Sequence, residues 1–420
     1  MKILGLITEY NPFHNGHLYH LNKSKEVTSS THTVAVMSGN FLQRGEPALI
    51  HKWARAKMAV EAGVDLVIEL PTPYSCATAE LFAYGSVFLL DSMGIVDVIC
   101  FGSEYGKVPL LRRIAEILED SPADFENYLK IHMKEGVPFP VARSKALVNY
   151  LKIQYDFDEN DLFDIEKIMN NPNNILAIEY LKVLRKLKSS ITPYTIPRLI
   201  APYHSTDITS PIASATAIRE TIKRDRFIDK IRNVVPLTTF NVLQEAFKEG
   251  VAPVFKEDFQ DAILTLLRRE SLENLSSYFD VVEGLENKIH YCSENSCSLS
   301  ELYNCIKSKR YTLTRIQRIS MHVLLNIKKN DIVTFNKKGP QYIRVLAFNN
   351  KGRELLKLMK SRAKLPIVSK INHYNPQNEI AKKMLHADIQ STNIYALALK
   401  NREYARRPLD FYLSPYYYKF

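Results

Sequence analysis

The sequence lacks any run of eighteen or more apolar residues, so we expect no membrane-spanning helix. Its five cysteines are odd in number and form no CxxC pair, which predicts a reduced chain without a disulfide framework or structural zinc. The first ten residues, MKILGLITEY, have no small-residue cleavage site and are predicted to form a buried strand, not a signal peptide. No P-loop GxxxxGK[ST] is present, which disfavours a kinase or GTPase. These absences favour a cytoplasmic globular protein.

Positive charge is scarce in most of the chain and concentrated at its end. The net charge is +11, yet residues 301–420 hold 24 Lys and Arg against 7 Asp and Glu. The first 300 residues therefore carry a net negative charge. So uneven a distribution predicts a polyanionic partner for the C-terminal region, with nucleic acid as the first candidate and a membrane surface as the second.

The first hundred residues alternate strand and helix patterns. Short apolar runs predict strands at 2–7, 31–37, 64–70 and 96–102. Between them, helical patterns begin at Gly16 and span 51–62 and 79–92. This alternation predicts an α/β fold, a Rossmann-like parallel sheet with its ligand at the carboxyl ends of the strands.

The rest of the chain is predicted to be mainly helical, and a boundary near residue 230 gives two domains. Residues 1–230 form the expected α/β, ligand-binding domain, and 231–420 a mainly α-helical, basic region. The remaining segments are predicted as helices at 107–170, 171–184 and 213–224, a strand at 194–200, and a strand, turn and helix over 342–359. The aromatic tail LDFYLSPYYYKF is expected to dock on the body of the protein.

The stretch TEYNPFHNGHLYH (8–20) follows the first predicted strand directly. It places His14 and His17 on one face of the first turn of a helix, where unpaired N–H groups and the helix dipole favour an anion. Gly16 lets a phosphate approach the backbone closely, and two imidazoles can donate hydrogen bonds to it. The pattern suits the negative charge that develops on an α-phosphate during attack.

Two other interpretations of these histidines remain open. The spacing also suits metal ligands, with His20 or Glu9 as a third. Alternatively, the imidazoles only cap the helix.

A second stretch, SATAIR (214–219), favours the phosphate interpretation. It places Ser214 and Thr216 at the start of another helix, with Arg219 one turn further on. Hydroxyls, backbone amides and a guanidinium there form an anion clamp, although Ser and Thr are also common as plain caps.

HNGH and SATAIR together resemble the signatures of the HxGH nucleotidyltransferase superfamily. The chain further resembles the bacterial tRNA(Met) cytidine acetate ligase family from its first residues to beyond residue 350. The stretches that carry this likeness are TEYNPFHNGHLYH (8–20), SGNFLQRGEPA (38–48), DLVIELP (65–71), FGSE (101–104), PNNILAIEYLK (172–182) and KSKRYTLTRIQR (307–318). In SATAIR, Ala215 replaces the serine usual in the superfamily, so Thr216 and Arg219 are the safer assignments.

The resemblance implies an enzyme that acetylates the wobble cytidine of elongator tRNA(Met). Acetate would attack the α-phosphate of ATP to give acetyl-adenylate and pyrophosphate, and the cytidine amine would then take the acetyl group. His14, His17 and Arg219 would be catalytic, and Mg²⁺ is expected on the pyrophosphate without nameable ligands. The implied ATP site, with Ser214 and Thr216 added from the clamp above, includes Ile7, Thr8, Glu9, Tyr10, Asn11, Pro12, Phe13, His14, Asn15, Gly16, His17, Leu18, Tyr19, His20, Gly102, Asn173 and Arg198.

The basic stretch 307–329 is the predicted tRNA-binding segment. An apolar stripe at helical spacing predicts that one face packs inward. Arg315, Arg318 and His322 are expected on another face that meets phosphates, and Tyr311 is expected to stack on an unpaired base. The residues predicted to bind tRNA are Lys307, Lys309, Arg310, Arg315 and Arg318.

Two other functions remain as alternatives. One is a nucleotidyltransferase that adenylylates a small phosphorylated metabolite, which leaves the basic C-terminal region without a role. The other is a non-catalytic protein that binds RNA and holds ATP as a structural ligand.

Overall fold

The computed structural model describes residues 1–137, 139–154, 159–198, 213–225 and 228–419. The chain forms two compact units: Met1–Asp97 with Leu199–Phe420, and Val98–Arg198. The functional division at residue 230 stays a prediction, and these units divide the chain at other points. None of the helices among the described residues is long and apolar enough to cross a membrane.

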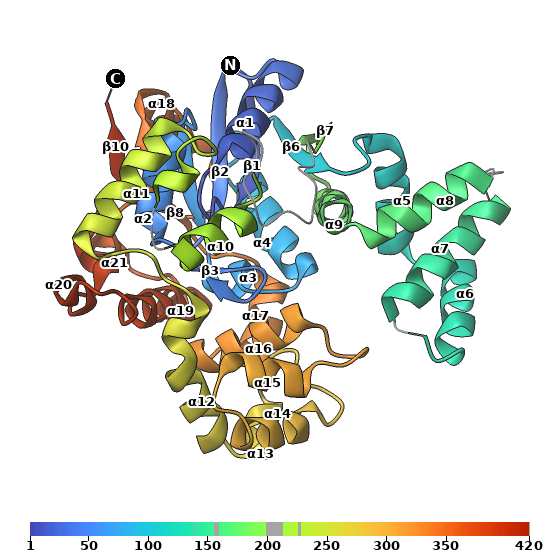
Figure 1. Ribbon diagram of the computed structural model, residues 1–420. Coiled ribbons are helices and arrows are strands. Elements are labelled where there is room, and N and C mark those ends of the chain that lie inside the picture. The colour runs from blue at the N-terminus through green and yellow to red at the C-terminus, as the bar shows by residue number, and fades with distance from the viewer. Residues whose placement is uncertain (138, 155–158, 199–212, 226–227, 420) are drawn as a thin grey trace. The chain divides into compact units, whose positions relative to one another are not determined.

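A mixed, mostly parallel sheet forms the centre of the first unit (Figure 1). The strands of this unit, in spatial order, are β10 (Tyr416–Tyr418), β8 (Ile343–Asn349), β5 (Leu66–Leu70), β2 (His32–Ser38) and β1 (Ile3–Thr8), with β9 (Ile367–Val368) beside β8. β1, β2 and β5 pair in parallel, whereas β8 runs antiparallel to β5. All residues of β2 and β5 are buried, which explains their almost continuous apolar sequences. The predicted α/β fold is therefore confirmed.

Helices cover this sheet, and those from α12 to α16 form a separate group (Figure 1). The helices before residue 98 are α1 (Asn15–Thr28), α2 (Lys52–Glu61), α3 (Thr72–Ser75) and α4 (Ala79–Ser92). The later helices of the unit are α10 (Ala215–Asp225), α11 (Leu237–Glu249), α12 (Gln260–Arg269), α13 (Leu272–Ser276), α14 (Leu285–Glu294), α15 (Leu299–Ile306), α16 (Leu313–Leu325), α17 (Lys329–Lys338), α18 (Asn350–Arg362), α19 (Glu379–Ala396), α20 (Arg402–Ala405) and α21 (Leu409–Tyr412). Short 3₁₀ turns occupy Asp229–Ile231, Lys256–Phe259 and Ile371–His373. The predicted helix at 79–92 is confirmed at both ends.

The second unit pairs two parallel strands and adds five helices among its described residues. The strands are β6 (Val98–Ser103) and β7 (Thr192–Pro197). The helices are α5 (Val108–Asp120), α6 (Ala123–Lys134), α7 (Phe139–Gln154), α8 (Glu159–Asn170) and α9 (Pro172–Lys186). Both strands were predicted from sequence, and residues 199 and 200 of the second prediction lie outside the described residues.

Two features of the first unit differ from the sequence predictions. Cys292 in α14 and Cys305 in α15 form a disulfide, so the prediction of a wholly reduced chain is wrong. The helical hairpin brings their Cα atoms to 5.8 Å, within the range a disulfide needs, although their spacing in sequence shows no such motif. A short antiparallel hairpin of β3 (Phe41–Leu42) and β4 (Glu46–Pro47) was also not predicted.

The aromatic tail docks on the sheet, as expected. β10 pairs in parallel with β8, and the Tyr417 ring stacks on Phe348 at 5.0 Å. The Tyr416 hydroxyl lies 2.7 Å from the Glu61 carboxylate in α2.

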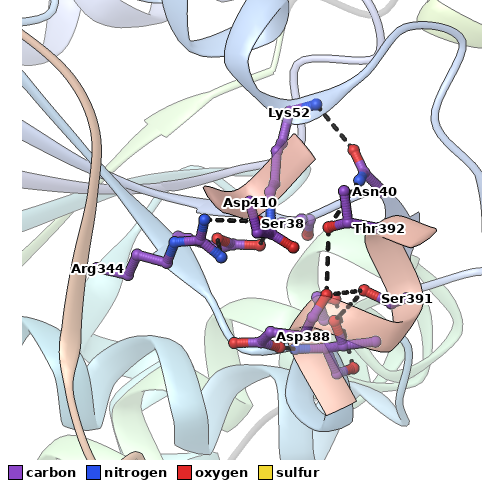
Figure 2. Close-up of polar contacts among 12 residues, drawn as sticks. Ser38, Asn40, Lys52, Arg344, Asp388, Ser391, Thr392 and Asp410 are labelled. Atoms are coloured by element: carbon purple, nitrogen blue, oxygen red, sulfur yellow. Dashed lines mark hydrogen bonds and ion pairs between the residues drawn. The ribbon is translucent and has the colours of Figure 1, made fainter. Parts of the chain in front are cut away.

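A buried ion-pair network joins the C-terminal segment to this sheet (Figure 2). Lys52 Nζ lies 2.7 Å from Glu69 Oε1 and 2.8 Å from Asp410 Oδ1. Arg344 bridges the same two carboxylates, at 3.0 Å from Glu69 and 2.6 Å from Asp410. None of the four side chains is more than 5% exposed. Glu69 and Arg344 are register partners on β5 and β8, while Lys52 begins α2 and Asp410 lies in α21.

Asp388 of α19 lies beside this network, and its pKa predicts how the free energy of unfolding changes with pH. Its carboxylate accepts hydrogen bonds from the Thr72 backbone N–H (2.6 Å) and the Tyr342 hydroxyl (2.5 Å). Burial, reinforced by the negative charge of Glu69, raises the pKa of Asp388 to about 7, although Lys52 opposes the rise. The Asp388 carboxyl therefore binds a proton more tightly in the folded state than in the unfolded chain. The stabilisation that this proton gives the folded state is complete below about pH 4 and is lost as the pH rises through 7.

We therefore expect the free energy of unfolding to fall between about pH 4 and pH 7, and Asp388→Asn to remove most of that slope. Urea unfolding of both proteins at several pH values measures the effect. Equal slopes for the two proteins would contradict the assignment to Asp388.

Candidate active site

The connection between β1 and α1 is held from inside by its aromatic side chains. Tyr10 and Phe13 are 2% and 0% exposed, and their ring centroids lie 4.7 Å apart. The Tyr10 ring also meets the edge of the His17 ring at 5.1 Å. Tyr10 has a φ of 49°, an uncommon conformation for a non-glycine residue that the surrounding packing maintains. The two side chains therefore shape the loop from within.

In both His14 and His17, the ring atom Nδ1 accepts a hydrogen bond from a backbone N–H. His14 is the N-cap of α1, and its Nδ1 accepts a hydrogen bond from the Gly16 N–H at 3.0 Å. His17 Nδ1 accepts from the His14 N–H at 3.2 Å, and the two rings stack at 3.7 Å. Because both Nδ1 atoms are acceptors, the proton of each neutral ring is on Nε2. Two stacked imidazoles thus each carry an N–H donor at the start of a helix.

Helix capping is therefore part of what these residues do, and the bonds that cap the helix are accepted by their Nδ1 atoms. The metal interpretation finds no support, because the described part of the chain contains no group of three or more His, Cys, Asp or Glu side chains placed to hold a metal ion. Asn15 also holds the chain, since its N–H and side-chain amide donate to the carbonyls of Val234 and Asn233, both at 3.0 Å. Its predicted contact with ATP stays a prediction.

Arg219 reaches the same loop from α10, as the sequence predicted. Its guanidinium donates to the Asn11 carbonyl at 3.0 Å and pairs with Glu46 at 2.7 Å. The side chain is 15% exposed, so a positive charge lies partly buried against Asn11, which precedes His14 by three residues in the chain. Ser214 accepts a hydrogen bond from the Ala217 N–H and so serves as a cap of α10, while Thr216 is exposed. The structure thus brings Arg219 and the β1–α1 loop together.

The sequence analysis missed a second arginine that organises this loop. Arg55 of α2 is completely buried, and it donates to the carbonyls of Glu9 (2.5 Å), Ser38 (3.1 Å), Ile50 (3.1 Å) and Gly39. Burial lowers the pKa of Arg55 to about 10, which leaves it charged at neutral pH. One guanidinium therefore holds the residues that follow β1 and β2. An arginine on the apolar side of the predicted helix 51–62 was the available signal.

Glu9, the residue that directly follows β1, has a carboxyl group whose pKa is raised. Burial raises its pKa, and the nearby Glu46 carboxylate adds to the rise, while a hydrogen bond from the Gln43 N–H (2.8 Å) opposes it. Because Gln43 belongs to the turn between β3 and β4, this bond ties the hairpin to the end of β1.

In the second unit, Asn173 and Arg198 come together around Glu104. The Arg198 guanidinium donates to Asn173 Oδ1, and the Asn173 side-chain amide donates to Glu104 at 2.6 Å. Glu104 also accepts the N–H of Asn174 at 2.8 Å, so a carboxylate already occupies the N-terminal end of α9. Gly102 lies in β6 opposite Ile196. Roles of Gly102, Asn173 and Arg198 in binding ATP stay predictions, and Glu104 is the partner that the sequence did not reveal.

Part of the predicted tRNA segment is engaged within the protein. Lys307, Lys309 and Arg310 are exposed, and Arg310 pairs with Glu283. Arg315 donates to the Asp280 carbonyl at 2.7 Å, and Arg318 lies 3.5 Å from the Asp280 carboxylate. Contact of these five residues with tRNA stays a prediction.

Two side chains of that segment do not lie where the sequence predicted. His322 is 0% exposed, and its Nε2 lies 2.6 Å from the Cys76 carbonyl. Burial lowers the pKa of His322, and a side chain without exposed surface cannot meet phosphates. Tyr311 is only 8% exposed, with the Arg315 guanidinium 5.4 Å from its ring centre, so it is not available for base stacking.

Helix α16 is also covered on more than its apolar stripe. The β3–β4 turn packs on it so closely that a Cβ at Gly45 (φ +74°) would lie 2.3 Å from the Arg318 backbone nitrogen. Helical spacing alone could not show this second contact.

Comparison with known proteins gives one consistent result. The family model described as HIGH nucleotidyl transferase matches residues 1–408. A protein of Alkaliphilus metalliredigens named tRNA(Met) cytidine acetate ligase is 50% identical over 100% of this chain and 99% of its own. A protein of the same name from Caldanaerobacter subterraneus is 47% identical over 98% of both chains.

Two solved structures of TmcAL from Thermotoga maritima are also similar over 100% of both chains, at 36% identity. The apo form superposes with a TM-score of 0.94, and a form bound with alpha-thio ATP with a TM-score of 0.92.

Proposed function

The chain belongs to the HIGH nucleotidyl transferase family, and we propose that within it the protein is an ATP-dependent tRNA(Met) cytidine acetate ligase. Its substrates are acetate, ATP and elongator tRNA(Met), and its product carries N4-acetylcytidine at the wobble position. We propose that it acts in the cytoplasm, where ATP and tRNA are both present.

The observation that carries this proposal is the pair of Nε2–H donors on His14 and His17 at the start of α1. In the first step a carboxylate oxygen of acetate attacks the α-phosphorus of ATP, and the bond to pyrophosphate breaks. Negative charge grows on the non-bridging α-phosphate oxygens, where two N–H donors and a helix N-terminus stabilise it. Arg219, held by Glu46, adds a positive charge beside the same loop.

In the second step the N4 amine of cytidine attacks the acetyl carbon of acetyl-adenylate. AMP leaves with the electron pair of the acyl–oxygen bond, and the amine loses a proton.

Acetate is a weak nucleophile and a small anion. The main task of the site in the first step is therefore to hold acetate close to ATP in spite of the repulsion between their negative charges.

Mg²⁺ is proposed only as a companion of the ATP phosphates. The described residues contain no group of three or more His, Cys, Asp or Glu side chains that could hold it. The exposed Lys307, Lys309 and Arg310, with the half-buried Arg315 and Arg318, are proposed to meet the tRNA backbone.

Transfer of carbon-14 from acetate to tRNA tests the proposal. We expect labelled tRNA only when ATP is present, and less of it at raised salt because phosphate contacts are screened. Acetate-dependent exchange of pyrophosphate into ATP, measured without tRNA, reports the first step alone. Exchange without labelled tRNA would indicate a different acceptor, and absence of both would leave a protein that only binds its nucleotide.

A further inference from the structure

The short segment that includes α20 and α21 exposes cationic and aromatic side chains together. Between residues 400 and 407 it carries Lys400, Arg402, Arg406 and Arg407 with Glu403 as the one acidic residue, and all five are exposed. Tyr412 is 64% exposed, and the Arg407 guanidinium lies 5.9 Å from its ring centre. We call Arg406, Arg407 and Tyr412 the Arg–Tyr platform.

A groove adjoins this platform. It has a volume of about 370 Å³ and lies between Gln390, Asn393 and Ile394 of α19, with Leu397 just after that helix, and the segment Ala405–Pro408. Leu397 is 64% exposed. Two amides and two apolar side chains therefore line one side of the groove, and two arginines lie on the other.

The segment is anchored at both ends, so the platform is held in place. At one end the Asn401 side-chain amide donates to the Glu249 carbonyl at 2.8 Å, and its backbone N–H donates to Gly250 at 2.9 Å. At the other end Leu409 and Asp410 are 2% exposed, and Asp410 enters the ion-pair network with Lys52 and Arg344 (Figure 2). Rigid presentation lowers the entropy lost when a ligand binds.

We propose that the Arg–Tyr platform and its groove form a second tRNA contact, which takes an unpaired base on Tyr412 and the adjoining phosphates on Arg406 and Arg407. Arginine pairs with phosphate through several N–H groups, and an exposed tyrosine ring stacks on any base. Residues 400–407 carry four cationic side chains and one carboxylate, which suits a polyanionic partner. The exposed Tyr412 ring adds a stacking surface that an RNA base can use and a simple anion cannot. This inference rests on tRNA as the substrate of the proposed function.

The anchor also relates the platform to the candidate active site. Asp410 bonds to Lys52, the first residue of α2, and one helical turn later Arg55 of α2 holds the Glu9 carbonyl at the end of β1. A tRNA whose cytidine is at the nucleotide site needs further contacts that fix its orientation, and the platform is attached to the same helix.

Binding of unmodified elongator tRNA(Met) transcript to the full-length protein, measured by fluorescence anisotropy at several salt concentrations, tests this inference. We expect Tyr412→Ala to weaken binding about tenfold and Tyr412→Phe, which keeps the ring, to bind like the unchanged protein. Changing Arg406 and Arg407 together to glutamine is expected to reduce the slope of log K against log salt by about two. The matched control changes Lys357 and Lys360 of α18, two exposed cations, to glutamine.

The inference is overturned if the Tyr412→Ala and double-arginine variants bind as the unchanged protein does, or if the lysine control weakens binding as much as the arginine pair. Thermal unfolding of each variant establishes that it is folded. Pyrophosphate exchange by the unchanged protein is a separate measurement, so a failure of the ligase proposal would be visible without the binding series.

Discussion

Replacing His14 with asparagine is expected to slow acetyl-adenylate formation by about 10²–10³-fold while the protein keeps its fold. Asparagine is a preferred N-cap, so its side-chain oxygen can take over the hydrogen bond that His14 Nδ1 accepts from the Gly16 N–H. What it cannot replace is the Nε2–H group that we propose to donate to the α-phosphate. The measurement is acetate-dependent exchange of labelled pyrophosphate into ATP.

His14→Ala is the matched comparison, because it removes both the cap and the donor. We expect the same loss of activity, with an additional loss of about 1 kcal/mol in the free energy of unfolding. Full activity of His14→Asn would show that the imidazole acts only as a cap of α1. His17→Ala should resemble His14→Asn in activity, since its Nε2–H is equivalent.

Replacing Lys52 with methionine is expected to lower the free energy of unfolding by about 3–5 kcal/mol. The substitution leaves Glu69 and Asp410, both completely buried, with Arg344 as the remaining partner of the network. Although burial opposes ionisation, Arg344 and Lys52 hold the pKa of Asp410 below its usual value, so this carboxylate is charged in the folded protein. Urea unfolding at pH 7 measures the loss.

Lys57→Met is the matched control, since it changes the same residue type in the same helix. Lys57 pairs with Glu245 at 2.9 Å, but the two side chains are 29% and 57% exposed. We expect a loss of at most about 1 kcal/mol there. Equal losses for the two variants would contradict a special role of the buried network.

The order of helices and strands could be predicted because it depends on local pattern. Continuous apolar runs predicted β1, β2 and β5, and a helical pattern predicted α4 at both of its ends. The position of HNGH after the first strand predicted His14 and His17 at the start of a helix, and SATAIR predicted that Arg219 belongs with them.

Other features depend on which distant segments meet. The sequence predicted a strand near 343–349, but only the folded chain shows it between β5 and β10. The disulfide of Cys292 and Cys305 depends on the turn between α14 and α15, which brings the two cysteines together. Their spacing in the sequence matches no motif that would indicate a disulfide. His322 was expected at the surface because its own helix offered no reason for burial, which comes instead from the residue that follows α3.

The sequence by itself determined the fold class, the position of two histidines at the start of the first helix and the basic character of the C-terminal region. Each of these follows from a short stretch of residues, through the periodicity of its apolar side chains, a sequence motif or the local number of charged residues. Only the tertiary structure decided which charges are available to a ligand. Lys52 and Asp410, 358 positions apart in the sequence, neutralise each other in the core, whereas Arg406 and Arg407 remain at the surface. The physical reason is that a charge is buried or exposed according to its neighbours in space, and in this chain those neighbours come from distant segments.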